Sequence, residues 1–223
     1  MSQIRITRET LLDGTLKQRR ELYAKAYPDM CFRSEAEMES LLEQTLAQLP
    51  AGDGLWVFGY GSLIWNPAFH YEEKHCALLR GWHRSFCLEL RMGRGTPEKP
   101  GLMLALDRGG ACRGVAFRIA ADQVRQELWL LWQREMFGGA YNAQWVNLNM
   151  GERTVKGLAF VINRSHPRYK RGLSTEQTAR MILDGTGELG SSLEYFENTV
   201  SHLRALGVQD TSLARIAAFL PSA

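Results

Sequence analysis

Residues 55–65 read Leu-Trp-Val-Phe-Gly-Tyr-Gly-Ser-Leu-Ile-Trp, and this stretch says more about fold and function than any other part of the chain. Its first four residues form a short apolar run that ends at glycines, which is typical of a buried strand. A strand that enters Gly-Tyr-Gly-Ser can turn tightly and direct several backbone N–H groups at one anion. The residues alone leave two interpretations open: a loop that binds a carboxylate or an oxyanion, or an ordinary structural turn.

The same stretch lacks the motifs of two common classes of enzyme. A dinucleotide fingerprint, G-x-G-x-x-G, would need glycine at position 64, where Ile64 stands, and no G-x-x-x-x-G-K-[ST] occurs anywhere in the chain. Residues 60–64 do not form the G-x-S-x-G elbow of serine hydrolases around Ser62. Nucleotide binding and serine hydrolysis are therefore not expected.

The elements predicted around this stretch indicate an α+β fold. Helices are predicted over 33–50, where Ser34 and Glu37 can form a capping box, and over 121–137, which stops before the left-handed cap expected at Gly138-Gly139. Further strands are predicted over residues 77–79, 86–90, 102–106, 114–119, 145–148 and 155–162. The segments 102–106 and 114–119 are expected to pair as a hairpin through the turn 107–110, and helices follow residue 174. Strands in the middle with helices at both ends favour α+β over alternating βαβ units.

Composition indicates an ordinary globular protein. The 223 residues are 45% hydrophobic and 23% charged, which suits a single domain over 1–223, with 1–52 as an N-terminal helical extension. Lysine and arginine number 27 against 24 acidic residues, without basic blocks, so no nucleic-acid partner is expected. No apolar stretch at the N-terminus resembles a signal peptide and no run of about 18 apolar residues occurs, which predicts a cytoplasmic protein with no membrane partner.

Cysteine and histidine spacing gives no indication of a disulfide framework or a metal site. The four cysteines include no C-x-x-C pair, so reduced thiols are expected. His70, His75 and His83 lie near Cys76 in sequence, but their spacing matches no recognised metal-ligand pattern. No metal is expected.

Glu135 is an unexpected residue in the helix predicted over 121–137. It lies three and four residues after Trp132 and Leu131, on the apolar side of the helix. Burial would disfavour the ionised carboxyl and raise its pKa toward neutrality, as a general acid/base requires. The alternative is a glutamate at the edge of the apolar stripe that reaches solvent or pairs with Arg134.

The polar loop 91–101 also has two interpretations. It reads Arg-Met-Gly-Arg-Gly-Thr-Pro-Glu-Lys-Pro-Gly and carries Arg91, Arg94 and Thr96 between glycines. Such a loop can cover a pocket or can simply be solvated.

Taken together, these segments resemble the ChaC family of γ-glutamylcyclotransferases from about Leu55 to Gln209. The resemblance rests on VFGYGSLIWNP at 57–67, GWHRSFC at 81–87, GRGT at 93–96 with PG at 100–101, LWQREM at 131–136, GGAY at 138–141 and GELGSSLEYF at 187–196. One departure is Ser192, where family members usually have asparagine before the late Glu-Tyr segment.

The resemblance implies a fold, an activity and a set of site residues. The implied fold is a small mixed β-barrel with helices around it, and the implied activity is a cofactor-free lyase of the C–N type, which splits glutathione into 5-oxoproline and cysteinylglycine. Glu135 would be the acid/base. The substrate-binding residues that we expect are Val57, Phe58, Gly59, Tyr60, Gly61, Ser62, Leu63, Arg94, Tyr141 and Tyr195. Relatives that act on γ-glutamylamines tend to read Y-G-T-L and those that act on general γ-glutamyl amino acids Y-G-S-N, so Ser62-Leu63 favours glutathione.

Two other functions stay open on the sequence. One is cyclisation of other γ-glutamyl peptides or amines, because selectivity depends on pocket walls that the sequence does not show. The other is a non-enzymatic regulator that keeps the pocket for sensing. The sequence does not predict the oligomeric state.

Overall fold

A closed five-stranded barrel forms the centre of the molecule. The computed structural model describes residues 6–50 and 52–221. The barrel strands are β1 (Leu55–Gly59), β2 (Glu73–Leu90), β3 (Gly101–Ile119), β4 (Tyr141–Asn149) and β5 (Thr154–Ile162), in the order β1-β3-β2-β4-β5. β1 closes the barrel by pairing parallel to β5, whereas its pairing with β3 is antiparallel. The small mixed barrel and the α+β class are both confirmed.

Strand β1 is buried on both faces, which explains its uninterrupted apolar sequence. Side chains alternate between the faces of a strand. Val57 joins a hydrophobic core that includes Trp132, and Phe58 joins a second core that includes Phe196. All five residues of β1 are buried, so the prediction of a buried strand is confirmed.

The hairpin predicted through 107–110 is wrong. Residues 101–119 form one continuous strand, which pairs antiparallel with the equally long β2, from Glu73 opposite Arg118 to Leu90 opposite Gly101. Gly109 and Gly110 do adopt positive φ angles, of 98° and 67°, but they bend β3 without reversing it. The register shift in β2 at Gly81 lies near the same place, so both strands bend together, as β-bulges allow.

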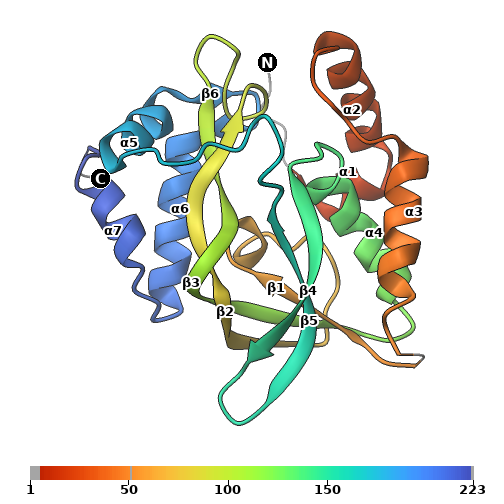
Figure 1. Ribbon diagram of the computed structural model, residues 1–223. Helices are drawn as coiled ribbons and strands as arrows, with labels where there is room; N and C mark the ends of the chain where they lie inside the picture. Colours follow the sequence, from red (N-terminus) through yellow and green to blue (C-terminus); the bar gives the residue numbers. More distant parts are fainter. Residues whose placement is uncertain (1–5, 51, 222–223) are drawn as a thin grey trace.

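Helices cover the barrel on two sides (Figure 1). On one side lie α1 (Arg8–Leu12), α2 (Thr15–Ala26), α3 (Glu35–Leu46) and α4 (Val124–Glu135). On the other lie α5 (Thr175–Asp184), α6 (Ser192–Ala205) and α7 (Thr211–Ala217). A short ribbon of β6 (Thr186–Gly187) and β7 (Gly190–Ser191) precedes α6. None of the helices in the described part of the chain combines the length and the apolar character that crossing a bilayer requires.

The two helices predicted most fully, over 33–50 and 121–137, are present but shorter, as Glu35–Leu46 and Val124–Glu135. The capping box of Ser34 and Glu37 opens α3 as expected. Helix α4 ends at Glu135, and its C-cap is Met136 in the right-handed region rather than a glycine. Gly139 has a positive φ of 68°, but it lies beyond the cap, where its N–H donates to the Met136 carbonyl.

The N-terminal helices pack against α4 through buried polar contacts. Arg8 of α1 forms a two-point ion pair with Glu127, whose side chain is 1% exposed. Arg20 of α2 donates to the Gln133 side chain at 2.9 Å. The polar side of α4 is therefore covered by residues that precede the barrel.

Candidate active site

The loop after β1 turns sharply into a single turn of 3₁₀ helix, η1 (Ser62–Ile64). The Ile64 N–H donates to the Gly61 carbonyl at 2.9 Å and the Asn66 N–H to the Ser62 carbonyl at 2.8 Å. Gly61 has φ −139°, so a left-handed backbone is not what requires glycine there. The requirement is space, because a Cβ on Gly61 would lie 2.7 Å from the Tyr195 hydroxyl oxygen.

Glu135, the last residue of α4, faces this loop. Its side chain is 15% exposed. Burial raises the pKa of the carboxyl, and the Arg134 guanidinium, with Nε 3.8 Å from Oε1, lowers it in part. The burial expected of an acid/base and the contact with Arg134 expected of the alternative are thus both present.

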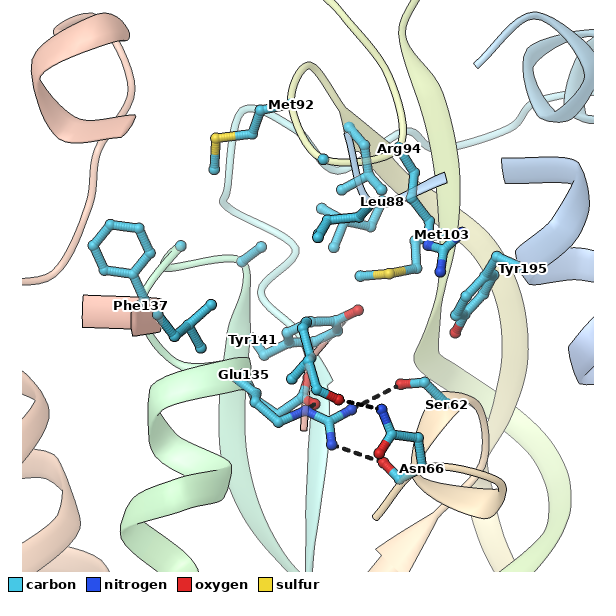
Figure 2. A pocket seen from close by; sticks show the side chains of 18 of the residues that line it. Ser62, Asn66, Leu88, Met92, Arg94, Met103, Glu135, Phe137, Tyr141 and Tyr195 are labelled. Atoms are coloured by element: carbon cyan, nitrogen blue, oxygen red, sulfur yellow. Dashed lines mark hydrogen bonds and ion pairs between the residues drawn. The ribbon is translucent and has the colours of Figure 1, made fainter. Parts of the chain in front are cut away.

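Arg134 contacts Glu135 and donates hydrogen bonds to the loop after β1. Its guanidinium donates to the carbonyls of Asn66 at 2.8 Å and Pro67 at 3.0 Å, and to Ser62 Oγ at 3.3 Å. Figure 2 shows Glu135, Ser62 and Asn66 in the lower part of the view, with dashed lines to Ser62 and Asn66. The end of α4 and the turn after β1 therefore hold the carboxyl and the loop in a fixed relation.

Three buried tyrosines complete the inner end of the site. Tyr60, Tyr141 and Tyr195 are 7%, 5% and 4% exposed. Tyr60 donates its hydroxyl hydrogen to a carbonyl of β5 and Tyr141 to a carbonyl of β3. Burial, reinforced by the charge of Glu135, raises the pKa of all three phenols. They are neutral at physiological pH and can act as hydrogen-bonding groups in a site of low polarity.

A cavity of about 580 Å³ opens above this inner end. Such a volume is typical of a site for a small molecule. The charged residues in its lining are Arg20, Arg94, Arg134, Arg168, Glu135 and Glu194. A narrower recess at the bottom, of about 30 Å³, is lined by the loop 60–63 together with Glu135, Tyr141 and Tyr195. Four arginines against two glutamates suit a ligand with net negative charge.

The expected residues of strand β1 itself do not line this space. Val57 and Phe58 are fully buried in the two cores, and neither they nor Gly59 belong to the lining of the cavity or of its recess. A Cβ on Gly59 would lie 2.9 Å from the Phe117 ring, so glycine there permits close packing under the loop.

The loop 91–101 covers the cavity with only part of its length. Met92, Gly93 and Arg94 belong to the cavity lining, whereas Arg91 pairs with Glu89. Arg94 donates to the carbonyl of Ser191 at 2.8 Å. The interpretation as a pocket cover therefore holds for residues 92–94.

Ser192, the departure from the family pattern, supports that loop. Its side chain is fully buried and its hydroxyl donates to the Arg94 carbonyl at 3.0 Å. The guanidinium of Arg94 in turn lies over the Tyr195 ring, 5.6 Å from its centre. Ser192 does not line the cavity itself, but its hydrogen bond holds Arg94, a residue of the cavity wall, in place.

Sequence reasoning missed the contribution of the N-terminal extension. Five of its residues line the cavity, and no motif marks them: Ile6, Thr7, Leu16, Arg20 and Tyr23. Asn66, Met103 and Asn198 were missed as well. Only the packing of α1 and α2 against α4 brings the first group to the site.

The side chains of His75 and His83 have separate partners and form no common cluster. His75 contacts Glu73, and His83 contacts the Gly109 carbonyl. Over residues 6–50 and 52–221 no three histidine, cysteine, aspartate or glutamate side chains form a group that could hold a metal ion. All four cysteines are free thiols.

Comparison with known proteins shows the family to which this fold and site belong. The family model described as ChaC-like protein matches residues 55–221, so the chain belongs to the ChaC-like family.

Named relatives and solved structures agree with this family. The chain is 39% identical over 209 residues to a glutathione-specific γ-glutamylcyclotransferase of Escherichia coli (strain K12), covering 93% of this chain and 89% of that protein. It is 34% identical to the human glutathione-specific γ-glutamylcyclotransferase 1, over 76% of this chain and 82% of the relative. A crystal structure of a yeast γ-glutamyl cyclotransferase specific to glutathione superposes with a TM-score of 0.68 at 19% identity, over 75% of this chain and 97% of that one. That structure supports the fold.

Proposed function

We propose that the protein is a glutathione-specific γ-glutamylcyclotransferase, a lyase that converts glutathione to 5-oxoproline and L-cysteinylglycine. The observation that carries the proposal is the buried Glu135 carboxyl, held by Arg134 beside the Ser62 loop at the closed end of a positively lined cavity. Two relatives that share most of their length with this chain carry this activity in their names.

The reaction needs little from the protein beyond proton transfer and orientation. The α-amine of the γ-glutamyl group attacks its own γ-carbonyl, which closes a five-membered ring and breaks the amide bond to cysteine. Intramolecular attack has a high effective molarity. Glu135 takes a proton from the α-ammonium and returns it to the leaving amine of cysteinylglycine.

The inner end of the cavity, next to the recess, holds the γ-glutamyl group in this mechanism. Backbone N–H groups of the loop 60–63 and the neutral phenol of Tyr195 can donate hydrogen bonds to the developing oxyanion, whereas Tyr141 already donates its hydroxyl hydrogen to a carbonyl of β3. Arg94, on the wall next to Tyr195, contributes positive charge for a carboxylate. Val57, Phe58 and Gly59 support the loop from below without contact with the cavity.

Purified protein incubated with glutathione and, separately, with γ-glutamyl-alanine tests the proposal. Release of 5-oxoproline from glutathione, at a kcat/KM well above that for γ-glutamyl-alanine, is expected. Comparable rates would favour a general γ-glutamyl cyclotransferase, and no release from either would favour a non-enzymatic protein that retains the pocket.

We also propose that the enzyme acts in the cytoplasm. Its four free cysteines, two of them exposed, suit a reducing compartment. Localisation of a tagged full-length chain by microscopy and fractionation tests this.

A further inference from the structure

A buried arginine of the N-terminal extension reaches the cavity with part of its guanidinium unpaired. Arg20 lies on α2 and is 7% exposed. Its Nη2 donates to Gln133 and its Nε to the Leu16 carbonyl, but Nη1 has no hydrogen-bond partner. Over residues 6–50 and 52–221 no carboxylate forms an ion pair with it. The charges of Glu35 and Glu21 act on Arg20, but neither side chain forms an ion pair with it, and a buried N–H group without a partner is costly, which points to an anionic ligand.

The position of Arg20 suits the far end of an extended substrate. The recess is lined by the loop 60–63, Glu135, Tyr195 and residues of the barrel, and contains no residue of α1 or α2. Arg20 belongs to the lining of the larger cavity, together with Leu16 and Tyr23 of the same helix. A ligand whose γ-glutamyl group lies at the inner end of the cavity, against the recess, would extend its other end into the space bounded by this helix.

We propose that Arg20 binds the glycine carboxylate of glutathione, so that the N-terminal extension selects the leaving group of the reaction. The inference rests on the proposed function. Glutathione carries a second carboxylate at the end remote from the γ-glutamyl group, and an arginine N–H is a strong donor to such a group. The matched family model begins at Leu55, so α2 is an addition to the part of the chain that it describes.

Arg168 is the rival for this role, because it also lines the cavity and has an unpartnered Nε. Its Nη2 donates to the Gly138 carbonyl at 2.9 Å, and the charge of Glu89 acts on it as those of Glu35 and Glu21 act on Arg20. The unpaired atom is buried in both side chains, but in Arg20 it is a terminal nitrogen, which rotation about the last side-chain bonds can bring to a ligand. We therefore assign the carboxylate to Arg20.

The test compares 5-oxoproline release from glutathione and from glutathione whose glycine carboxyl is amidated. For the wild-type protein we expect a preference for glutathione in kcat/KM of roughly 10- to 100-fold, the range of one charge-assisted hydrogen bond. Arg20→Met should remove this preference by raising KM for glutathione, with little effect on the amide. Arg20→Lys should restore part of it.

Two matched controls accompany this comparison. Arg19→Met, at the neighbouring residue that pairs with Glu188 outside the cavity lining, should keep the preference. Arg168→Met should keep it as well. Loss of the preference in Arg168→Met with its retention in Arg20→Met would overturn the assignment.

The wild-type protein alone also tests the inference, should Arg20→Met fail to fold. Equal turnover of glutathione and its amide would overturn the role of Arg20 while the proposed function stood. Absence of 5-oxoproline from both substrates would overturn the proposed function, and the inference with it.

Discussion

At the scale of the residue, the pKa of Glu135 depends on two opposing electrostatic effects. Burial raises the pKa of its carboxyl and the Arg134 guanidinium lowers it, with burial the larger effect. A carboxyl with a raised pKa releases and recovers a proton more readily near neutral pH, which suits a group that must do both in one turnover.

Glu135→Gln should abolish most of the activity. The amide keeps the shape of the side chain but cannot accept and return a proton, so we expect kcat to fall by about 10²- to 10⁴-fold. The measurement is the rate of 5-oxoproline release, with circular dichroism as the check on folding. Turnover within about tenfold of wild type would exclude proton transfer by this residue.

The acidic limb of the pH profile should report the raised pKa. Glu135 must be ionised to act as a base, so kcat/KM falls as the pH drops through its pKa, and this limb should lie above pH 4.5, the ordinary value. Arg134→Met removes the charge that lowers the pKa, so the limb should move to still higher pH. A limb that stays in place in Arg134→Met would contradict this electrostatic account.

Substitutions at Ser62 and Gly61 should differ in how much activity and binding they remove. Ser62→Ala removes one neutral hydroxyl, so we expect a loss of about 0.5–1.5 kcal/mol, at most roughly tenfold in kcat/KM. Gly61→Val places a side chain where even a Cβ would lie 2.7 Å from the Tyr195 oxygen, so binding should be lost. A Ser62→Ala loss as large as that of Glu135→Gln would indicate a covalent nucleophile, and a γ-glutamyl adduct on Ser62, sought by rapid quench and mass spectrometry, would establish it.

At the scale of the element, α4 connects the N-terminal helices to the barrel. Its apolar side packs Leu128 and Trp132 into the core, and its polar side buries Glu127 against α1. Although burial raises the pKa of Glu127, hydrogen bonds from Arg8 and from the His70 backbone outweigh it and lower the pKa. Folding therefore gains stability from this group above the ordinary pKa, and loses that gain as the pH falls through the lowered one.

Arg8→Met should destabilise the protein strongly. It leaves the Glu127 carboxylate, 1% exposed, without its counter-ion, and such losses cost about 3–5 kcal/mol. Urea unfolding at neutral pH measures the change. Lys17→Met, which removes an exposed pair with Glu35, is the control and should change stability little. Equal losses of unfolding free energy in the two variants would show that the buried Arg8–Glu127 pair stabilises the fold no more than the exposed pair does.

At the scale of the whole molecule, we propose that the chain forms one domain, with 1–52 as a helical extension of it. Arg8, Arg20 and Arg33 each bond to α4 or to the turn after it, and Arg20 also faces the cavity. Thermal unfolding should then be one transition, with far-ultraviolet circular dichroism and tryptophan fluorescence coinciding. Two separate transitions would show that the extension folds independently.

Local pattern was enough to predict much of this protein. The buried strand at 55–58, the capping box of α3, the late helices and the unusual position of Glu135 follow from residue spacing. Each of these depends on neighbours within a few positions of the chain, so a single sequence contains the information.

The long strand β3 and the N-terminal wall of the cavity required the tertiary structure. Asp-Arg-Gly-Gly at 107–110 is a good turn sequence, yet pairing with β2 on both sides of it keeps the strand extended. Arg20 carries no local sign of function, and it reaches the cavity only because α2 packs against α4. The sequence alone determined many of the elements and the acid/base candidate, whereas the extent of β3, the strand partners and the pocket walls come from contacts between residues far apart in the chain, which spacing does not record.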